Sequence, residues 1–244
     1  MPLTKPSPSV TIRIEQQLMG NLIRTWIRIL TLRFSESDLL TFGNKHLIFG
    51  LLCTWLVGIG RFWDNPRAAF IQHLGLGSVI YVFILAGYLY IVILALKPER
   101  WSYRHLLTFI VLTSPPAILY AIPVELWVDG ETARDINVWF LGIVATWRVL
   151  MYSVYLRRQG RLTGLVQITA TLTPLALIVF VLTALNLEQA VFDFMGGLRH
   201  RETAEDRVYG VLVGLSIISF FVSPVLLLFY VSAIFTRHRK ASSE

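Results

Sequence analysis

Six apolar runs, separated by short polar connections, constrain this chain more than any other feature of its sequence. They lie at about 45–60, 74–96, 105–126, 137–156, 163–186 and 208–235. A helix needs about 20 residues to cross a hydrocarbon core about 30 Å thick, so each run predicts one membrane-spanning helix. Charged residues make up only 15% of the 244 residues, whereas soluble domains average about 25%. The sequence therefore predicts an all-α integral membrane protein with six transmembrane helices.

The distribution of lysine and arginine predicts the orientation of these spans. Of the 22 basic residues, 15 lie in the segments 1–45, 97–104 and 157–161 and after residue 235. Six lie in the alternate connections, which are 61–73, 127–136 and 187–207. Because basic loops stay in the cytoplasm, we expect both termini to be cytoplasmic, with residues 236–244 as a cytoplasmic tail. A bacterial inner membrane is the expected location.

The segment before the first span has two parts. Residues 1–11 are rich in proline and are predicted to be disordered, and residues 12–44 are predicted to hold an amphipathic helix and a linker. On a helical wheel, Arg13, Arg24 and Arg28 fall in one narrow polar sector opposite a broad apolar arc. This pattern is typical of a helix that lies in the membrane surface. We expect it to bind anionic lipids at the cytoplasmic face, and the alternative is packing against the rest of the protein.

Arg148 is the only charged residue predicted to lie near the middle of a span. It follows the expected start of the fourth span by eleven residues, which corresponds to a depth of about 16 Å. The third span carries Pro115 and Pro116 at a similar depth, directly after Ser114. A proline removes one helical N–H and frees the carbonyl four residues earlier, so the third span is predicted to break there. Glu125 adds a carboxylate nearer the outer end.

Two hypotheses follow for this group of residues. In the first, Arg148 is a structural clamp that donates hydrogen bonds to the carbonyls freed in the third span. In the second, the broken span and the arginine form a substrate or ion site, as transporters build with discontinuous helices. The first agrees with the lack of any other charged residue at that depth.

Catalytic and metal-binding motifs are not found in the sequence. Cys53 is the single cysteine, and the five histidines form no pair at helical spacing. Neither a Gly-X-Ser-X-Gly nor a His-Glu-X-X-His pattern occurs. We therefore expect no cofactor and no metal, and we do not expect an enzyme. The short basic loops favour a membrane over nucleic acid as the partner of the positive charge.

The stretch WSYRHLLTFIVLTSPPAILYAIPVE, residues 101–125, resembles the Yip1-type multi-span membrane proteins. The resemblance covers about a tenth of the chain, and six spans differ from the five usual in that family. It implies a non-enzymatic role in membrane organisation or trafficking. We therefore expect a non-catalytic membrane scaffold or assembly partner, with a membrane protein or a second copy of the chain as its partner. The alternative is a small transporter or channel subunit that uses Arg148 and the broken third span.

Overall fold

The structure is a computed structural model, and it describes residues 8–62, 70–184 and 205–241. All regular elements in these ranges are helical. The long helices are α1 (Pro8–Leu30), α3 (Asn44–Phe62), α5 (Leu76–Leu94), α7 (Gly130–Gln159), α8 (Gly164–Ala184) and α10 (Glu205–Ala241). The short ones are α2 (Glu36–Leu40), α4 (Phe70–His73), α6 (Tyr103–Leu112) and the 3-10 helices η1 (Pro115–Ala121) and η2 (Val124–Leu126). An all-α fold is thus confirmed for the described part of the chain.

Four of these helices, α5, α7, α8 and α10, are long and apolar enough to cross a membrane. A fifth candidate is α6 together with η1 and η2, if this bent pair forms one span. The first predicted run, 45–60, corresponds to α3, which is not among these candidates in the described residues. The described residues are therefore compatible with a membrane location, and the count of six spans stays a prediction.

The helix boundaries differ from the predicted ones at the starts of α1 and α7. α1 begins at Pro8, inside the segment 1–11 predicted to be disordered, because proline is tolerated in the first turn of a helix, where no N–H partner is needed. α7 begins at Gly130 rather than 137, because the Asp129 side chain accepts hydrogen bonds from the backbone N–H groups of Glu131 and Thr132. The predicted disorder of residues 1–7 and most of the predicted outer connection 187–207 lie outside the described residues.

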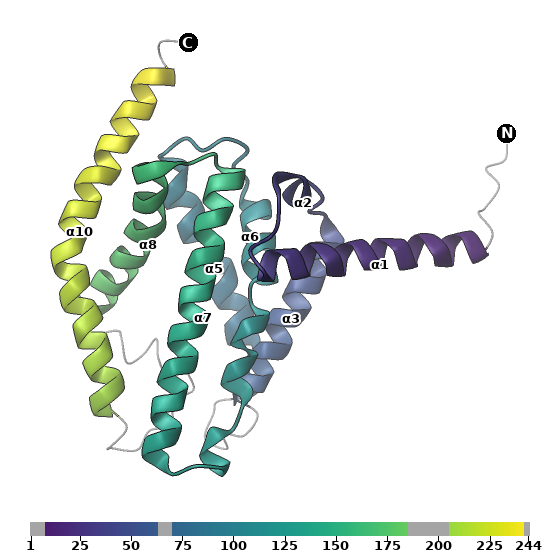
Figure 1. The fold of residues 1–244 in the computed structure, drawn as a ribbon, viewed down its shortest axis with the longest axis horizontal. Helices are drawn as coiled ribbons and strands as arrows, with labels where there is room; N and C mark the ends of the chain where they lie inside the picture. Colours follow the sequence, from purple (N-terminus) through teal and green to yellow (C-terminus); the bar gives the residue numbers. More distant parts are fainter. Residues whose placement is uncertain (1–7, 63–69, 185–204, 242–244) are drawn as a thin grey trace.

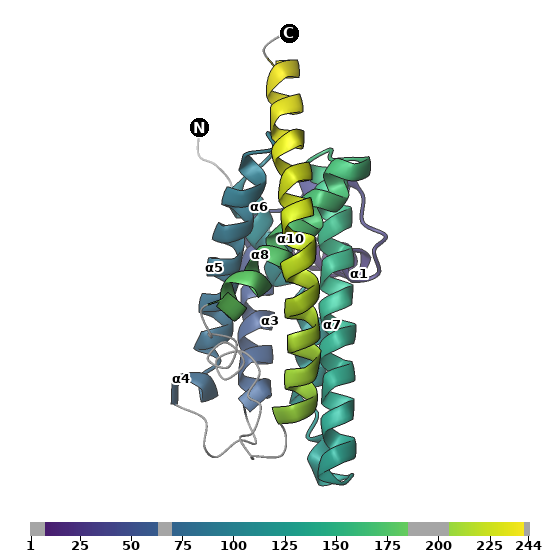
Figure 2. The same cartoon turned by 90° about the vertical axis from the view of Figure 1, so that its left-hand side faces the viewer.

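The helices are arranged as an elongated bundle with one helix across it. α5, α7 and α10 run along the long direction of the bundle in both views, whereas α1 runs across it (Figures 1 and 2). α3 packs against α5, α6 and η1, while α8 contacts α10, α7 and α5. The C-terminal ends of α7 and α10 lie at the same end of the bundle, together with the start of α8 (Figure 1). We call this the basic end, because Arg157, Arg161 and Arg237 lie there.

Small residues bring α3 close to its neighbours. A Cβ atom at Gly50 would lie 2.4 Å from the Val111 Cγ2 atom of α6, and one at Gly58 would lie 2.7 Å from the Gly75 carbonyl oxygen. Gly75 itself has a positive φ of 67°, which only glycine adopts without strain. Close approach at small residues is the usual way in which membrane helices pack, since lipid offers no hydrophobic drive between them.

Candidate functional site at the junction of α1 and the broken span

The third apolar run breaks where the two prolines were predicted to break it. α6 ends at Leu112, η1 begins at Pro115, and the two segments are bent by 43°. Ser114, in the break, is 4% exposed and its hydroxyl lies 2.8 Å from the Thr54 hydroxyl of α3. The break is thus held by a buried pair of hydroxyl groups, one of them on α3.

The indole of Trp26 in α1 docks at this break. Its Nε1 donates a hydrogen bond of 3.2 Å to the carbonyl of Leu112, and its ring contacts Phe49 edge to face at a centroid distance of 5.4 Å. Leu112 lies just before the prolines and has lost a helical partner to the break. α1 therefore supplies a donor that the broken helix lacks.

The C-terminal end of α1 is fixed by a second tryptophan. Leu32 has a φ of 60°, and the N–H of Arg33 bonds to the carbonyl of Arg28 at 2.9 Å, so the helix ends in a Schellman motif. The carbonyl of Leu30, which this motif leaves free, accepts a bond of 3.0 Å from Trp147 Nε1 of α7. α1 is thereby bound to α6 and α7 by one indole each.

The side chains of α1 fall on three faces of the helix. Leu22 and Ile29 are buried against the bundle, together with Thr25. Met19, Ile23 and Ile27, on an adjacent arc, are 58%, 41% and 49% exposed. Arg24 and Arg28 are also exposed, on a third arc away from these apolar residues. The apolar surface of α1 is therefore wider than the part that the bundle covers.

The short helix α2 holds α1 from the polar side. Arg28 pairs with Asp38 at 2.9 Å, and Asp38 and Ser35 form a capping box at the start of α2. Burial alone would raise the pKa of the Asp38 carboxyl. The hydrogen bonds from the backbone and side chain of Ser35 and from Arg28, with the Arg28 charge, outweigh burial and hold that pKa below its ordinary value. Asp38 is therefore a carboxylate at neutral pH.

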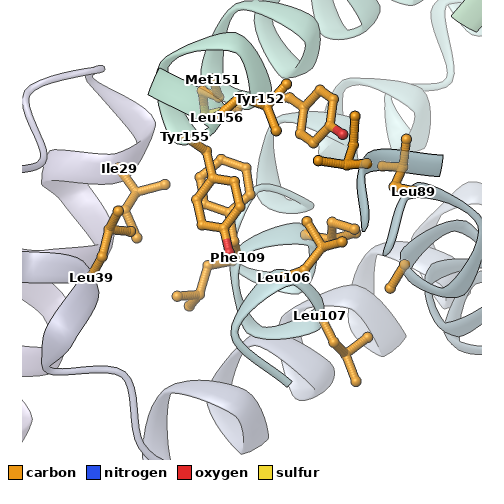
Figure 3. Close-up of a cluster of buried hydrophobic side chains, with 14 of the residues drawn as sticks. Ile29, Leu39, Leu89, Leu106, Leu107, Phe109, Met151, Tyr152, Tyr155 and Leu156 are labelled. Carbon is orange, nitrogen blue, oxygen red and sulfur yellow. The ribbon is translucent and has the colours of Figure 1, made fainter. Parts of the chain in front are cut away.

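Further contacts join the N-terminal segment to the basic end. Figure 3 shows Ile29 and Leu39 pointing toward the stacked rings of Phe109 and Tyr155, whose centroids are 4.3 Å apart. Phe34 is fully buried, and the Arg158 guanidinium lies 4.8 Å from its ring centroid. These contacts bury the apolar side of the predicted linker in the main core of the protein.

Charged side chains surround this apolar contact. Glu36 of α2 lies 3.5 Å from Arg100 and 3.7 Å from Arg161, and Arg161 lies 3.2 Å from Glu99. All four side chains are about half exposed, so each pair adds at most about 1 kcal/mol. The buried apolar side chains, rather than these ion pairs, supply most of the docking energy.

Arg148 does not make the contact predicted for it. Among the described residues its guanidinium forms no hydrogen bond or ion pair, although its side chain is half-buried on α7. Trp26 is the donor to Leu112, and the Val111 carbonyl lies 3.5 Å from the hydroxyl of Thr54. The predicted contact of Arg148 with these carbonyls is therefore not among those of the described residues, and donors from α1 and α3 make it instead.

The other predicted residues are spread over the molecule. Pro116 lies in η1, and Glu125 lies in η2, where it accepts a hydrogen bond of 3.0 Å from Asn137 at the far end of the bundle from α2. Arg24 is exposed and has no polar partner among the described residues, whereas the side chain of Arg13 lies outside them. The structure therefore brings together Ser114 and the break, but not Arg148 or Glu125.

Sequence reasoning missed Trp26 and Asp38. The Ser35-X-X-Asp38 spacing is a recognisable capping signal, and it could have identified α2. Nothing in the sequence marks Trp26 as a partner of a carbonyl 86 positions away. Among the described residues, no group of three or more His, Cys, Asp or Glu residues could hold a metal ion.

Comparison with protein-family models, with curated proteins and with solved structures gave no match. The resemblance of residues 101–125 to Yip1-type proteins therefore stays an expectation from the sequence.

Proposed function

We propose that this protein is a non-catalytic scaffold of the bacterial inner membrane, with six spans and both termini in the cytoplasm. The functional element is α1, which lies at the cytoplasmic face of the bilayer. There it binds anionic lipid or a partner protein. One observation carries this proposal. α1 runs across the bundle and exposes an apolar arc, Met19, Ile23 and Ile27, beside an arc of arginines.

The chemistry of the two arcs supports this placement. An interfacial helix buries its apolar face about 5–10 Å into the boundary between headgroups and acyl chains and keeps its basic face toward anionic headgroups. Arg28 faces α2 through Asp38, and α2 lies on the side of α1 nearer the basic end (Figure 1). The exposed isoleucines then face toward the bilayer interior, where lipid chains would cover them.

Quenching of a fluorophore by lipids tests the placement. Met19→Cys and Asn21→Cys, each in a Cys53→Ser background, put a label on two exposed positions about 160° apart around α1. In nanodiscs that contain lipids with quenchers on their acyl chains, we expect strong quenching at position 19 and weak quenching at position 21. Equal quenching at both positions would contradict the interfacial helix.

Lipid charge tests the partner. The difference in quenching between positions 19 and 21 should grow when anionic lipid replaces neutral lipid, and Arg24→Gln should reduce this gain, since each basic residue near an anionic surface contributes about 1 kcal/mol. Gly20→Ala is the matched control, because it changes an exposed residue of the same helix without a change in charge, and its added Cβ would have no atom within 4 Å. A difference in quenching that does not grow with anionic lipid, or that grows equally in Arg24→Gln, would refute the anionic-lipid part.

A small transporter or channel subunit is the second candidate. One observation favours it: the guanidinium of Arg148, half-buried on α7, makes no polar contact within the described part of the chain. Its five N–H donors could therefore bind an anion. Proteoliposomes should be assayed for uptake of small anions with the wild type and with Arg148→Ala. Uptake that Arg148→Ala abolishes at unchanged thermal stability supports transport, and no uptake with either protein supports the scaffold.

A further inference from the structure

Two arginines from different loops meet at the basic end of the bundle. Arg100 lies in the loop between α5 and α6, and Arg161 lies in the loop between α7 and α8. The Nη1 atom of Arg100 is 3.5 Å from the Oε2 atom of Glu36, and the Nη2 atom of Arg161 is 3.7 Å from the same oxygen. Since both distances end on one atom, the two nitrogens lie at most about 7 Å apart, which is within the span of one small oxyanion.

The Glu36 carboxylate is held only weakly between these arginines. Hydrogen bonds between a charged donor and a charged acceptor are about 2.7–2.9 Å long, whereas the two distances to Glu36 are 3.5 and 3.7 Å. All three side chains are about half exposed, so solvent screens their attraction. A more highly charged anion that reaches both guanidinium groups can therefore displace the carboxylate.

The backbone holds the two arginines in a fixed arrangement. Arg100 has a φ of 47° and Arg161 has a φ of 49°, in the left-handed region that is strained for residues with a side chain. The N–H of Glu99 donates a hydrogen bond of 3.3 Å to the carbonyl of Gly160, and the side chain of Gln159 donates one of 2.8 Å to the carbonyl of Arg100. Each loop thus fixes the other. Strained residues that are held in this way are typical of ligand sites.

Positive charge exceeds negative charge around the two loops. The Nη1 atom of Arg237 donates hydrogen bonds of 3.0 and 3.2 Å to the carbonyls of Leu96 and Lys97, which brings a third guanidinium to the α5–α6 loop. Glu99, which lies 3.2 Å from Arg161, supplies a second carboxylate. In the described part of the chain, the ion pairs here thus involve two carboxylates, against three guanidiniums and the exposed ammonium of Lys97. This surplus favours an anion with two negative charges.

We propose that Arg100 and Arg161 form a binding site for a phosphate group, and that the Glu36 carboxylate occupies the phosphate position in this structure. Two oxygens of a phosphate group, about 2.5 Å apart, can each accept a hydrogen bond of about 2.8 Å from one guanidinium, which spans the distance between the arginines. Phosphate binding releases Glu36, so the ligand competes with the contact between α2 and the two loops. The site rests on these contacts and not on the placement of α1 in the membrane.

Two sources of ligand share this chemistry: a lipid headgroup that ends in a phosphate and a soluble phosphate compound. The test uses one probe of each kind, dioctanoyl phosphatidic acid and inorganic phosphate. Each is titrated into the full-length protein in a neutral detergent at constant ionic strength, and phosphorus NMR measures its dissociation constant. We expect saturable binding of at least one probe, and the tighter one identifies the source. Binding of neither probe would overturn the site.

Variants with opposite expected effects test the competition with Glu36. Arg161→Gln should weaken binding of the tighter probe about tenfold, because it removes hydrogen bonds to a charged group. Glu36→Gln should strengthen binding about two- to fivefold, because a weak surface ion pair no longer competes. Glu131→Gln, which makes the same change of charge at the opposite end of α7, is the matched control and should leave the affinity unchanged. An affinity that Glu36→Gln lowers or leaves unchanged would contradict the competition.

A second pair of variants separates a defined site from diffuse attraction. Arg157 is exposed at the same end of the bundle, so Arg157→Gln removes the same charge as Arg161→Gln but should weaken binding far less. Arg161→Lys keeps the charge but loses the planar fork of donors, so it should restore only part of the affinity. Each variant should keep the wild-type Tm, because the replaced side chains lie at the surface. Equal losses in Arg157→Gln and Arg161→Gln, or full affinity in Arg161→Lys, would show that the attraction is diffuse and that the site is wrong.

Discussion

Replacing Asp38 by alanine should release the N-terminal segment from the basic end of the bundle. The carboxylate accepts two bonds of 2.8 Å from Ser35, through its N–H and its hydroxyl, and one of 2.9 Å from Arg28. Loss of a helix cap costs about 1 kcal/mol. The pair with Arg28, whose side chain is 48% exposed, adds up to about 1 kcal/mol. Asp38→Ala should therefore weaken docking by about 2 kcal/mol, or roughly 30-fold in the population of the released state.

Limited digestion with trypsin measures this population. Arg33 is exposed between α1 and α2, and cleavage follows the population of the open state when opening and closing are fast. The initial rate of cleavage after Arg33 should rise roughly 30-fold in Asp38→Ala, in keeping with the free-energy change above. Asp129→Ala is the matched control, because Asp129 caps α7 in a similar way but at the opposite end of the bundle. A rate within twofold of the wild type, or an equal rise in Asp129→Ala, would refute the reasoning.

Three further predictions concern packing, orientation and pH. Gly50→Ala should lower the free energy of unfolding by roughly 1–3 kcal/mol, because its Cβ would lie 2.4 Å from an α6 side chain. Gly87→Ala is the control, because its Cβ would have no atom within 4 Å. In the same thermal unfolding assay it should be neutral or slightly stabilising. In a cysteine-free background, a thiol reagent that cannot cross the membrane should label Thr163→Cys from the cytoplasm and Glu131→Cys from outside, and labelling of both from one side would contradict the orientation. The pKa of Asp38 is lowered in the folded protein. The Asp38 carboxylate therefore stabilises the folded state fully above its unfolded pKa of about 3.9, and this stabilisation is lost as the pH falls through the folded pKa. Hydrogen exchange of α2 amides, corrected for intrinsic rates, should therefore rise below about pH 4 in the wild type but not in Asp38→Asn.

The helices and the break could be predicted from the sequence because their causes are local. Apolar runs of 18 residues or more and a proline pair determine local structure through hydration and backbone chemistry alone. The cap at Asp129 is equally local, but the charged residues Glu131, Arg134 and Asp135 after it do not fit an apolar run. The resulting error was confined to the first turns of α7.

The environment of Arg148 could not be predicted, because it depends on where distant segments pack. The depth argument correctly identified unpaired carbonyls beside Pro115, but several donors in the chain could have reached them. The tertiary fold selects Trp26 and Thr54, from α1 and α3. Similarly, the helical wheel identified the two faces of α1 but could not tell which part of its apolar arc the bundle covers and which part stays exposed.

The two tryptophan bonds of α1 also bear on how the protein is made. Trp26 and Leu30 are synthesised 86 and 117 residues before their partners Leu112 and Trp147. At about 5–20 residues per second, α1 exists for on the order of 10 s before its docking surface does. During that interval the side of α1 that later packs on α6 and α7 is uncovered, and under the placement proposed above the membrane surface would cover it. Changes that reduce the amphipathicity of α1 but spare its final contacts should therefore lower the yield of folded protein more than its stability.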